Sequence, residues 1–219
     1  MKTSFPVLRH RTAKGFSLME VLIVMVIIVV LATLTIGIYT WMETRKNEEA
    51  CTSITKRINM GLTQYYSDHG RYPYGTEKPF QNSGLAVADG GDYSSNVVYM
   101  ALFGDFKNTG IPEKNATIYD TELNPASQPG ANPTVREIQL RDKAGQQKTL
   151  YILSDPWGQP YRYTLGYDQS IPRRGSNAKY GLGNNPTFDF WSFGKDGDSN
   201  PKNLRAPENA DDIGNQPKL

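Results

Sequence analysis

The sequence has 219 residues, with 24 lysines and arginines against 22 aspartates and glutamates, for a formal net charge of +2. Four of the basic residues lie within the first 15 positions, which hold no acidic residue, so the rest of the chain has a net charge of −2. Because the basic excess is confined to one short terminal segment, the charge argues against a nucleic-acid partner.

An apolar segment follows this basic leader. Residues 21–42 contain no charged side chain, and these 22 positions are enough for a helix rising ~1.5 Å per residue to span a ~30 Å hydrocarbon core. The basic leader predicts that the amino terminus stays in the cytoplasm while the bulk of the chain crosses the membrane. No small-residue cleavage site follows the apolar segment, so the layout differs from that of a secretory signal peptide.

A single carboxylate, Glu20, lies at the start of the apolar segment, and the leader ends at Gly15, directly before Phe16. A glycine, then a phenylalanine, a glutamate at the fifth position after the glycine, and a long apolar run together resemble the pattern of the type IV filament prepilins. The resemblance implies cleavage after Gly15 by a prepilin peptidase, methylation of the new amino group on Phe16, and assembly into a filament. We expect Glu20 to pair with the amino group of a neighbouring subunit, because an unpaired carboxylate in lipid is costly.

The helix is expected to continue beyond the membrane. Apolar side chains recur there at intervals of three and four, at Cys51, Ile54, Ile58, Leu62 and Tyr65. This spacing predicts an amphipathic helix that packs one face on a domain. Gly70 is a natural carboxy-terminal cap and Pro73 follows it, so we expect one helix of about fifty residues that ends near position 70.

Shorter elements are predicted farther along the chain. The sequence indicates a short helix over residues 94–103, an antiparallel hairpin of residues 136–140 and 148–153 around a turn at 141–145, and a last strand over 188–193. The expected fold is α+β and pilin-like: a long N-terminal helical spine packed on a small antiparallel β-sheet, with a C-terminal loop. Its parts are a cleaved leader (1–15), a transmembrane and assembly helix (16–42), the periplasmic half of the spine (43–70) and a globular domain (71–219).

Three segments resemble the major pseudopilins of type II secretion systems. Residues 64–73 match a turn of the form Tyr…Asp-x-Gly-Arg-Tyr-Pro, residues 154–163 match an Asp-Pro-Trp-Gly-x-Pro-Tyr turn and strand, and residues 194–197 match the Gly-x-Asp-Gly that follows the last strand. We interpret Trp157 in the second segment as a side chain that plugs the core rather than as a binding residue.

Catalytic chemistry has little support in the sequence. Beyond the leader the chain holds one histidine, His69, and one cysteine, Cys51, and it carries no recognisable nucleophile elbow, phosphate-binding loop or zinc motif. We therefore predict a protein that is not an enzyme.

Acidic and amide side chains gather near the carboxy terminus, at Asp196, Asp198, Asn200, Glu208, Asn209, Asp211 and Asp212. Oxygen ligands at this density suit Ca²⁺. An EF-hand is rejected because Pro201 stands where that loop needs glycine. Composition alone favours a solvated acidic tail and a calcium site equally. The pseudopilin resemblance implies calcium, with Asp196, Asp198, Asp211 and Asp212 as the candidate ligands.

The function expected from these resemblances is that of a structural subunit of a periplasmic pseudopilus that serves type II secretion. The implied partners are other copies of the chain, the prepilin peptidase, an inner-membrane assembly platform, minor pseudopilins and, before assembly, the lipid bilayer. One alternative is a major or minor type IV pilin of a surface filament, although many type IVa pilins close their C-terminal region with a disulfide that Cys51 cannot form alone. A second alternative is a membrane-tethered periplasmic binding module or enzyme, for which Glu20 has no evident use.

Overall fold

The computed structural model describes residues 15–75, 93–127, 134–142, 145–166, 185–201 and 203–216. Leader residues 1–14, on which the topology prediction depends, lie outside this part of the chain. The chain divides into two compact units, Met1–Glu43 and Thr44–Leu219, and each is described by itself.

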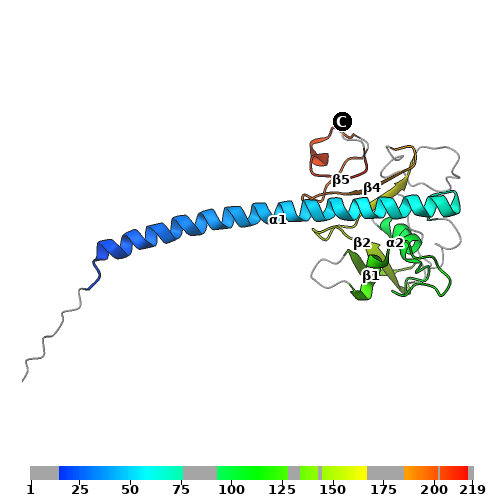
Figure 1. Cartoon of the computed structure of the whole chain (residues 1–219), viewed down its shortest axis with the longest axis horizontal. Helices are drawn as coiled ribbons and strands as arrows, with labels where there is room; N and C mark the ends of the chain where they lie inside the picture. The colour runs from blue at the N-terminus through cyan, green and yellow to red at the C-terminus, as the bar shows by residue number, and fades with distance from the viewer. Residues whose placement is uncertain are drawn as a thin grey trace, which may run out of the picture. The chain divides into compact units, whose positions relative to one another are not determined.

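The longest element is α1, Leu18–His69, a helix of 52 residues (Figure 1). Its length confirms the prediction of one helix of about fifty residues. At its end the N–H of Gly70 donates to the carbonyl of Tyr66 at 2.7 Å, and Gly70 has a φ of +67°. This left-handed conformation costs glycine little, so Gly70 ends the helix as its position predicts.

Within the first unit, α1 presents its apolar side chains to the surroundings. The described large apolar residues between positions 21 and 42 are all exposed, from Val21 at 47% to Tyr39 at 66%. Among the described residues, α1 is the one helix long and apolar enough to cross a membrane. It has the character of a membrane anchor, because side chains of this kind are stable only against lipid or other protein.

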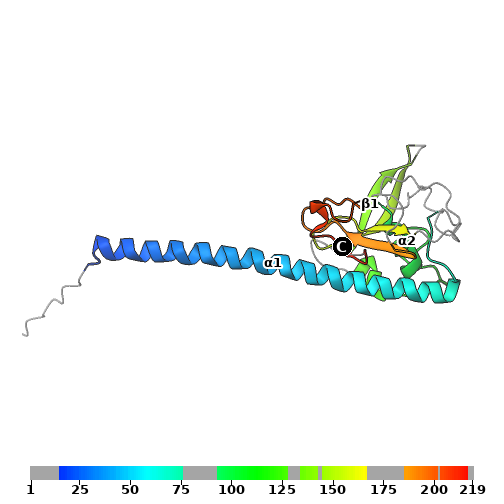
Figure 2. The ribbon, with the colours of Figure 1, turned by 90° about the horizontal axis from the view of Figure 1, so that it is seen from above.

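In the second unit, α1 forms one wall of the core. Cys51, Ile58 and Leu62 are fully buried, which confirms the amphipathic stripe. Both sheets and the short helix α2, Ser95–Phe103, lie along one side of this half of α1 (Figure 2). A Cβ added to Gly61 would lie 3.0 Å from the Leu102 side chain, so the missing side chain at this position allows the two helices to approach closely.

Helix α2 is buried along its whole length and is tied to the strands by two serines. Ser94 directly precedes α2, but its hydroxyl accepts no N–H of the helix and instead accepts the backbone N–H of Tyr163 at 2.8 Å. The Ser95 hydroxyl lies 3.1 Å from the N and 3.2 Å from the O of Leu153. These bonds join α2 to backbone groups of the strands that contain Leu153 and Tyr163.

The predicted hairpin is present as β1, Val135–Arg141, and β2, Gln147–Leu153, paired antiparallel with Ile138 opposite Leu150. A second antiparallel sheet has the order β3–β4–β5, from β3, Arg162–Leu165, through β4, Phe188–Ser192, to β5, Ile213–Gly214. The sequence predicts a single sheet. The structure has two, because the turn over residues 154–160 ends β2, and β3 then pairs with β4.

Three short 3₁₀ helices complete the described elements: Thr121–Leu123, Pro125–Ser127 and Pro207–Asn209. The first is joined to α1 through Arg57, whose Nε donates to a carboxylate oxygen of Asp120 at 2.8 Å.

Trp157 is partly buried and packs against the core, as expected for a side chain that plugs it.

Candidate functional site

The predicted cleavage site precedes α1. Gly15 and Phe16 lie outside the helix, and Phe16 is 87% exposed. A Cβ added to Gly15 would have no neighbouring atom within 4 Å. Packing within the described part of the chain therefore places no requirement for glycine at this position. A requirement imposed by another molecule, such as a peptidase, remains consistent with this geometry.

Helix α1 begins with a capping box formed by Ser17 and Glu20. The backbone N–H of Ser17 donates to Oε2 of Glu20 at 2.9 Å, and the N–H of Met19 donates to the Ser17 hydroxyl at 3.3 Å. The pattern Ser-x-x-Glu satisfies two backbone donors that have no partner within the helix. This arrangement was visible in the sequence but was missed there, because Glu20 was considered only as a carboxylate in lipid.

The capping box changes what Glu20 shows about function. The carboxylate has a use within a single chain, so its presence does not by itself argue against a simple membrane tether. Its side chain is nevertheless exposed, and its hydrogen bond with the N–H of Ser17 uses Oε2 alone. The other oxygen is thus available for a second, intermolecular contact.

The predicted calcium ligands lie in the loop between β4 and β5. Oδ2 of Asp211 accepts the consecutive backbone N–H groups of Lys195 and Asp196, at 2.6 and 3.1 Å. Successive N–H groups that point at one anion form a nest, which here holds the carboxylate of the protein itself. A Cβ added to Gly194 would lie 2.4 Å from the Asp211 carbonyl oxygen, so the loop closes tightly at this point.

The remaining acidic side chains are also engaged within the loop. Oδ1 of Asp196 accepts the N–H of Asp198, and Oδ1 of Asp198 accepts the N–H of Ser199, each at 2.9 Å. The Ser199 hydroxyl donates to Oδ2 of Asp212 at 2.6 Å. Asp196 thus contacts the Asp211 carboxylate through its backbone N–H. Asp212 contacts a different part of the loop, at Ser199.

Asn209 crosslinks the loop. Its Oδ1 accepts the N–H of Asn200 at 2.6 Å, and its Nδ2 donates to the carbonyls of Asn200 and Asn203 at 2.9 Å each. Nowhere in the described part of the chain do three histidine, cysteine, aspartate or glutamate side chains gather into a metal-binding group. A calcium ion takes 6–8 oxygen ligands, so most of them would have to be carbonyl, hydroxyl or amide oxygens of this loop.

A second polar cluster is buried beneath α1. Sγ of Cys51 lies 3.2 Å from the hydroxyl of Tyr161, and the Ser192 hydroxyl donates to Oδ2 of Asp155 at 2.5 Å. Burial raises the pKa of Cys51 from 9.0 to about 11, and it also raises the pKa of Asp155 above its ordinary value. A thiol in this state is protonated at neutral pH and is a poor nucleophile.

The two side chains most often used in nucleophilic catalysis are far apart. Cys51 and His69 both lie in α1, and 18 positions at ~1.5 Å each separate them by about 27 Å along the helix axis. His69 stacks on Tyr65 with ring centroids 4.1 Å apart. These two residues therefore cannot act together within one chain.

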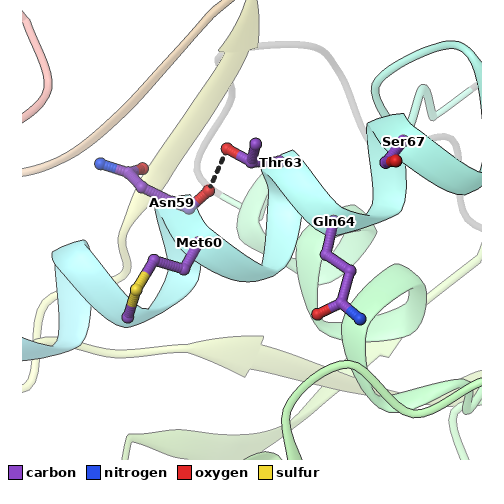
Figure 3. A pocket seen from close by; sticks show the side chains of 5 residues that line it. All are labelled: Asn59, Met60, Thr63, Gln64 and Ser67. Carbon is purple, nitrogen blue, oxygen red and sulfur yellow. Dashed lines mark hydrogen bonds between the residues drawn. The ribbon is translucent and has the colours of Figure 1, made fainter.

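A shallow hollow lies on the outward face of α1 in the second unit. Figure 3 shows the five side chains that line it, with the Thr63 hydroxyl bonded to the carbonyl of Asn59 at 2.8 Å: Asn59, Met60, Thr63, Gln64 and Ser67. None of them is titratable. The hollow thus offers no acid or base.

A comparison with protein families agrees with the geometry of the amino terminus. The family described as "Prokaryotic N-terminal methylation motif" matches residues 10–36, which include Gly15, Phe16 and Glu20. The chain is therefore prepilin-like in this segment, a class that is processed by a prepilin peptidase and assembles into filaments. The chain matches no curated protein and no solved structure in the comparisons made.

Proposed function

We propose that the protein is a structural subunit of a periplasmic pseudopilus that serves protein export by a type II secretion system. The observation that carries the proposal is the prepilin motif at the head of an uncovered apolar helix. Before assembly the apolar side chains of residues 21–42 lie in the inner membrane. In the fibre the helices of neighbouring subunits cover them.

The proposal places the globular part of the chain in the periplasm after Gly15 is removed with the leader. Assembly then requires an inner-membrane platform and minor pseudopilins, and Glu20 pairs with the amino group of Phe16 in the next subunit. Leaving one charge of such a pair unmatched costs more than removing both, so the pair selects correctly aligned neighbours.

The C-terminal loop supports the pseudopilin over the pilin. Cys51 is the only cysteine in the sequence, and it is buried on α1. No disulfide can therefore close the loop within one chain, and its own hydrogen bonds hold it instead. We further propose that calcium bound by Asp196, Asp198, Asp211 and Asp212, together with loop carbonyls, strengthens this closure.

The experiment that tests the proposal is deletion of the gene in the native host. A pseudopilin deletion abolishes the release of secreted enzymes into the medium and leaves surface pili and twitching motility intact. The opposite pattern would identify a type IV pilin. If neither changes, and the chain yields no crosslinked ladder in membranes, the protein is a tethered module and the proposal fails.

A further inference from the structure

A candidate modification site lies on the loop that follows α2. Asparagine, then any residue except proline, then serine or threonine is the acceptor triplet for N-glycosylation. Asn115, Ala116 and Thr117 form this triplet, and it is the only one in the sequence. Two similar triplets, which begin at Asn132 and Asn185, carry proline in the middle and are thereby excluded.

The two side chains that an enzyme must read are accessible. Asn115 and Thr117 are both exposed, as is Lys114 beside them. Within the described part of the chain, the Asn115 amide has no hydrogen-bond partner. It differs in this from Asn96 and Asn209, whose amides hold backbone groups of the fold.

The backbone around the triplet is anchored at both ends, and between them it is held by one backbone hydrogen bond and by the half-buried Ala116. The N–H of Glu113 donates to the carbonyl of Gly104 at 2.9 Å, and the N–H of Tyr119 donates to the carbonyl of Leu102 at 2.8 Å. Between these anchors, one described backbone bond closes the turn, from the N–H of Ala116 to the carbonyl of Glu113 at 3.0 Å.

Opening that turn breaks one backbone hydrogen bond and the contact of Ala116 with Gly104, and local opening of such a loop leaves the rest of the domain folded. The loop can thus enter the active site of a transferase in an extended form, while α2 remains packed in the core.

We propose that Asn115 is the acceptor of an N-linked oligosaccharide. The co-reactant is an oligosaccharide carried on a polyprenyl diphosphate, and an oligosaccharyltransferase catalyses the transfer. Nδ2 of Asn115 forms a bond to C1 of the first sugar, and the bond from C1 to the diphosphate oxygen breaks. Nδ2 loses a proton to a base of the transferase, and the polyprenyl diphosphate leaves. The hydroxyl of Thr117 is the group by which the enzyme recognises the triplet.

This inference rests on the proposed export of the domain, because a transferase of this kind acts on the outer side of the membrane. Attachment at Asn115 would place a bulky, hydrated group on an exposed turn, where it displaces no core contact. The glycan would therefore add to the surface of the exported domain without altering its fold.

The test uses the full chain purified from its native host. Trypsin releases residues 115–136 as one peptide, because Lys114 precedes it and Arg136 ends it. Electron-transfer fragmentation should place a saccharide mass on Asn115 and none on Asn124 or Asn132 of the same peptide. The mass should disappear in Asn115→Gln and Thr117→Ala, and it should persist in Thr117→Ser, which keeps the hydroxyl.

Two results would overturn the proposal. One is a peptide in which Asn115 is wholly unmodified, recovered from protein whose domain is shown by protease accessibility to be exported. The other is an adduct that survives Thr117→Ala. Exported, fibre-forming protein with a bare Asn115 would refute this inference and leave the proposed function standing. A domain that stays in the cytoplasm would refute both.

Discussion

The backbone N–H of Ser17 donates to Oε2 of Glu20 at 2.9 Å, at the first turn of a helix whose following side chains are apolar and uncovered. Glu20 therefore has two separable roles. It caps α1 within one subunit, which needs only a hydrogen-bond acceptor. In the proposed fibre it also pairs with the amino group of Phe16 in a neighbour, which needs a negative charge.

Two substitutions separate these roles. Glu20→Ala removes both the acceptor and the charge, whereas Glu20→Gln keeps an acceptor for Ser17 and removes the charge alone. If the pairing drives assembly, both variants insert into the membrane at normal levels and both fail to enter fibres. Loss of the acceptor for the Ser17 N–H costs about 0.5–1.5 kcal/mol, the net value of one hydrogen bond, and Glu20→Gln should avoid most of that cost.

The measurement is chemical crosslinking of membranes and of sheared fibres, with membrane insertion checked by carbonate extraction. Ser17→Ala serves as the matched control, because it weakens the cap and leaves the charge in place. Normal fibre formation by Glu20→Gln would show that Glu20 acts as a cap only and would exclude the intermolecular pair.

Processing provides a second prediction. Protein extracted from membranes should begin at Phe16 with a methylated amino group, and intact-mass analysis should show the loss of residues 1–15. Gly15→Leu should block the cut, because the larger side chain would crowd the peptidase. A Cβ at this position would meet no atom of the described chain within 4 Å, so the variant should fold normally. A mature chain that retains Met1 would contradict the prediction.

Elements with a local, repeating signal were predictable from the sequence. The spacing of Cys51, Ile58 and Leu62 indicated which face of α1 is buried, and Gly70 indicated where the helix ends. The alternation in residues 136–140 and 148–153 gave the hairpin to within two residues at each end. In each case neighbouring residues carry the information, so one stretch of sequence is sufficient.

Contacts between distant residues were not predictable in this way. Cys51 and Tyr161 are separated by 110 positions, and no periodicity connects them. Strand β5 has two residues, too few to show alternation. Near the carboxy terminus, composition revealed that acidic and amide groups gather, but it could not show that Asn209 and Asp211 hold the backbone of the loop.

The third prediction concerns calcium. A ligand that binds only the folded state stabilises it by ~2.7 kcal/mol at a hundredfold excess over the Kd, which for a domain of this size raises the Tm by several degrees. Calorimetry of the full chain in detergent should therefore show a higher Tm in CaCl₂ than in EGTA. An equal concentration of MgCl₂ should not replace calcium, because Mg²⁺ demands a near-ideal octahedron.

The Asp211 carboxylate stabilises the loop even without calcium, so the Tm values of loop variants must be compared with and without the ion. Asp211 accepts two backbone N–H groups, so Asp211→Ala should lower the Tm even in EGTA. The informative quantity is the calcium-dependent increment, which should shrink in Asp211→Ala and Asp198→Ala. It should be unchanged in Glu49→Ala, an acidic residue outside the loop. An equal Tm for the natural chain in both buffers would mean that hydrogen bonds alone close the loop.

The fourth prediction concerns the buried thiol. The pKa of Cys51 is raised to about 11 by burial, so the folded state holds its proton more tightly than the unfolded state does. Stability from this group is complete below pH 9, and it is lost as the pH rises through about 11. The difference in unfolding free energy between the natural chain and Cys51→Ala should therefore narrow across that range. Rapid reaction of the native thiol with a disulfide reagent near pH 8 would contradict this expectation.

The fifth prediction concerns Asp155, which organises the turn between β2 and β3. Its Oδ1 accepts the N–H groups of Trp157 and Gln159, at 3.0 and 2.8 Å, and its Oδ2 accepts the hydroxyl of Ser192. Asp155 is 1% exposed and Ser192 is fully buried, so Asp155→Ala would remove the acceptor of one buried hydroxyl and of two part-buried N–H groups. A buried donor left without its acceptor costs ~1–3 kcal/mol, and the part-buried N–H groups add less because water can reach them, so we expect a clear loss of stability.

Asp155→Asn is the matched variant, because it keeps an acceptor for both backbone donors and cannot ionise. Burial raises the pKa of Asp155 above its ordinary value, so the folded state binds the proton more tightly than the unfolded state. The stability of the natural chain therefore falls as the pH rises from below the ordinary value through the raised one. Asparagine has no such dependence, so Asp155→Asn should be closer in stability to the natural chain at pH 7 than at pH 3. Denaturant unfolding of both proteins at the two pH values measures this difference, and a gap that widens toward pH 7 would show that the ionised carboxylate stabilises the turn.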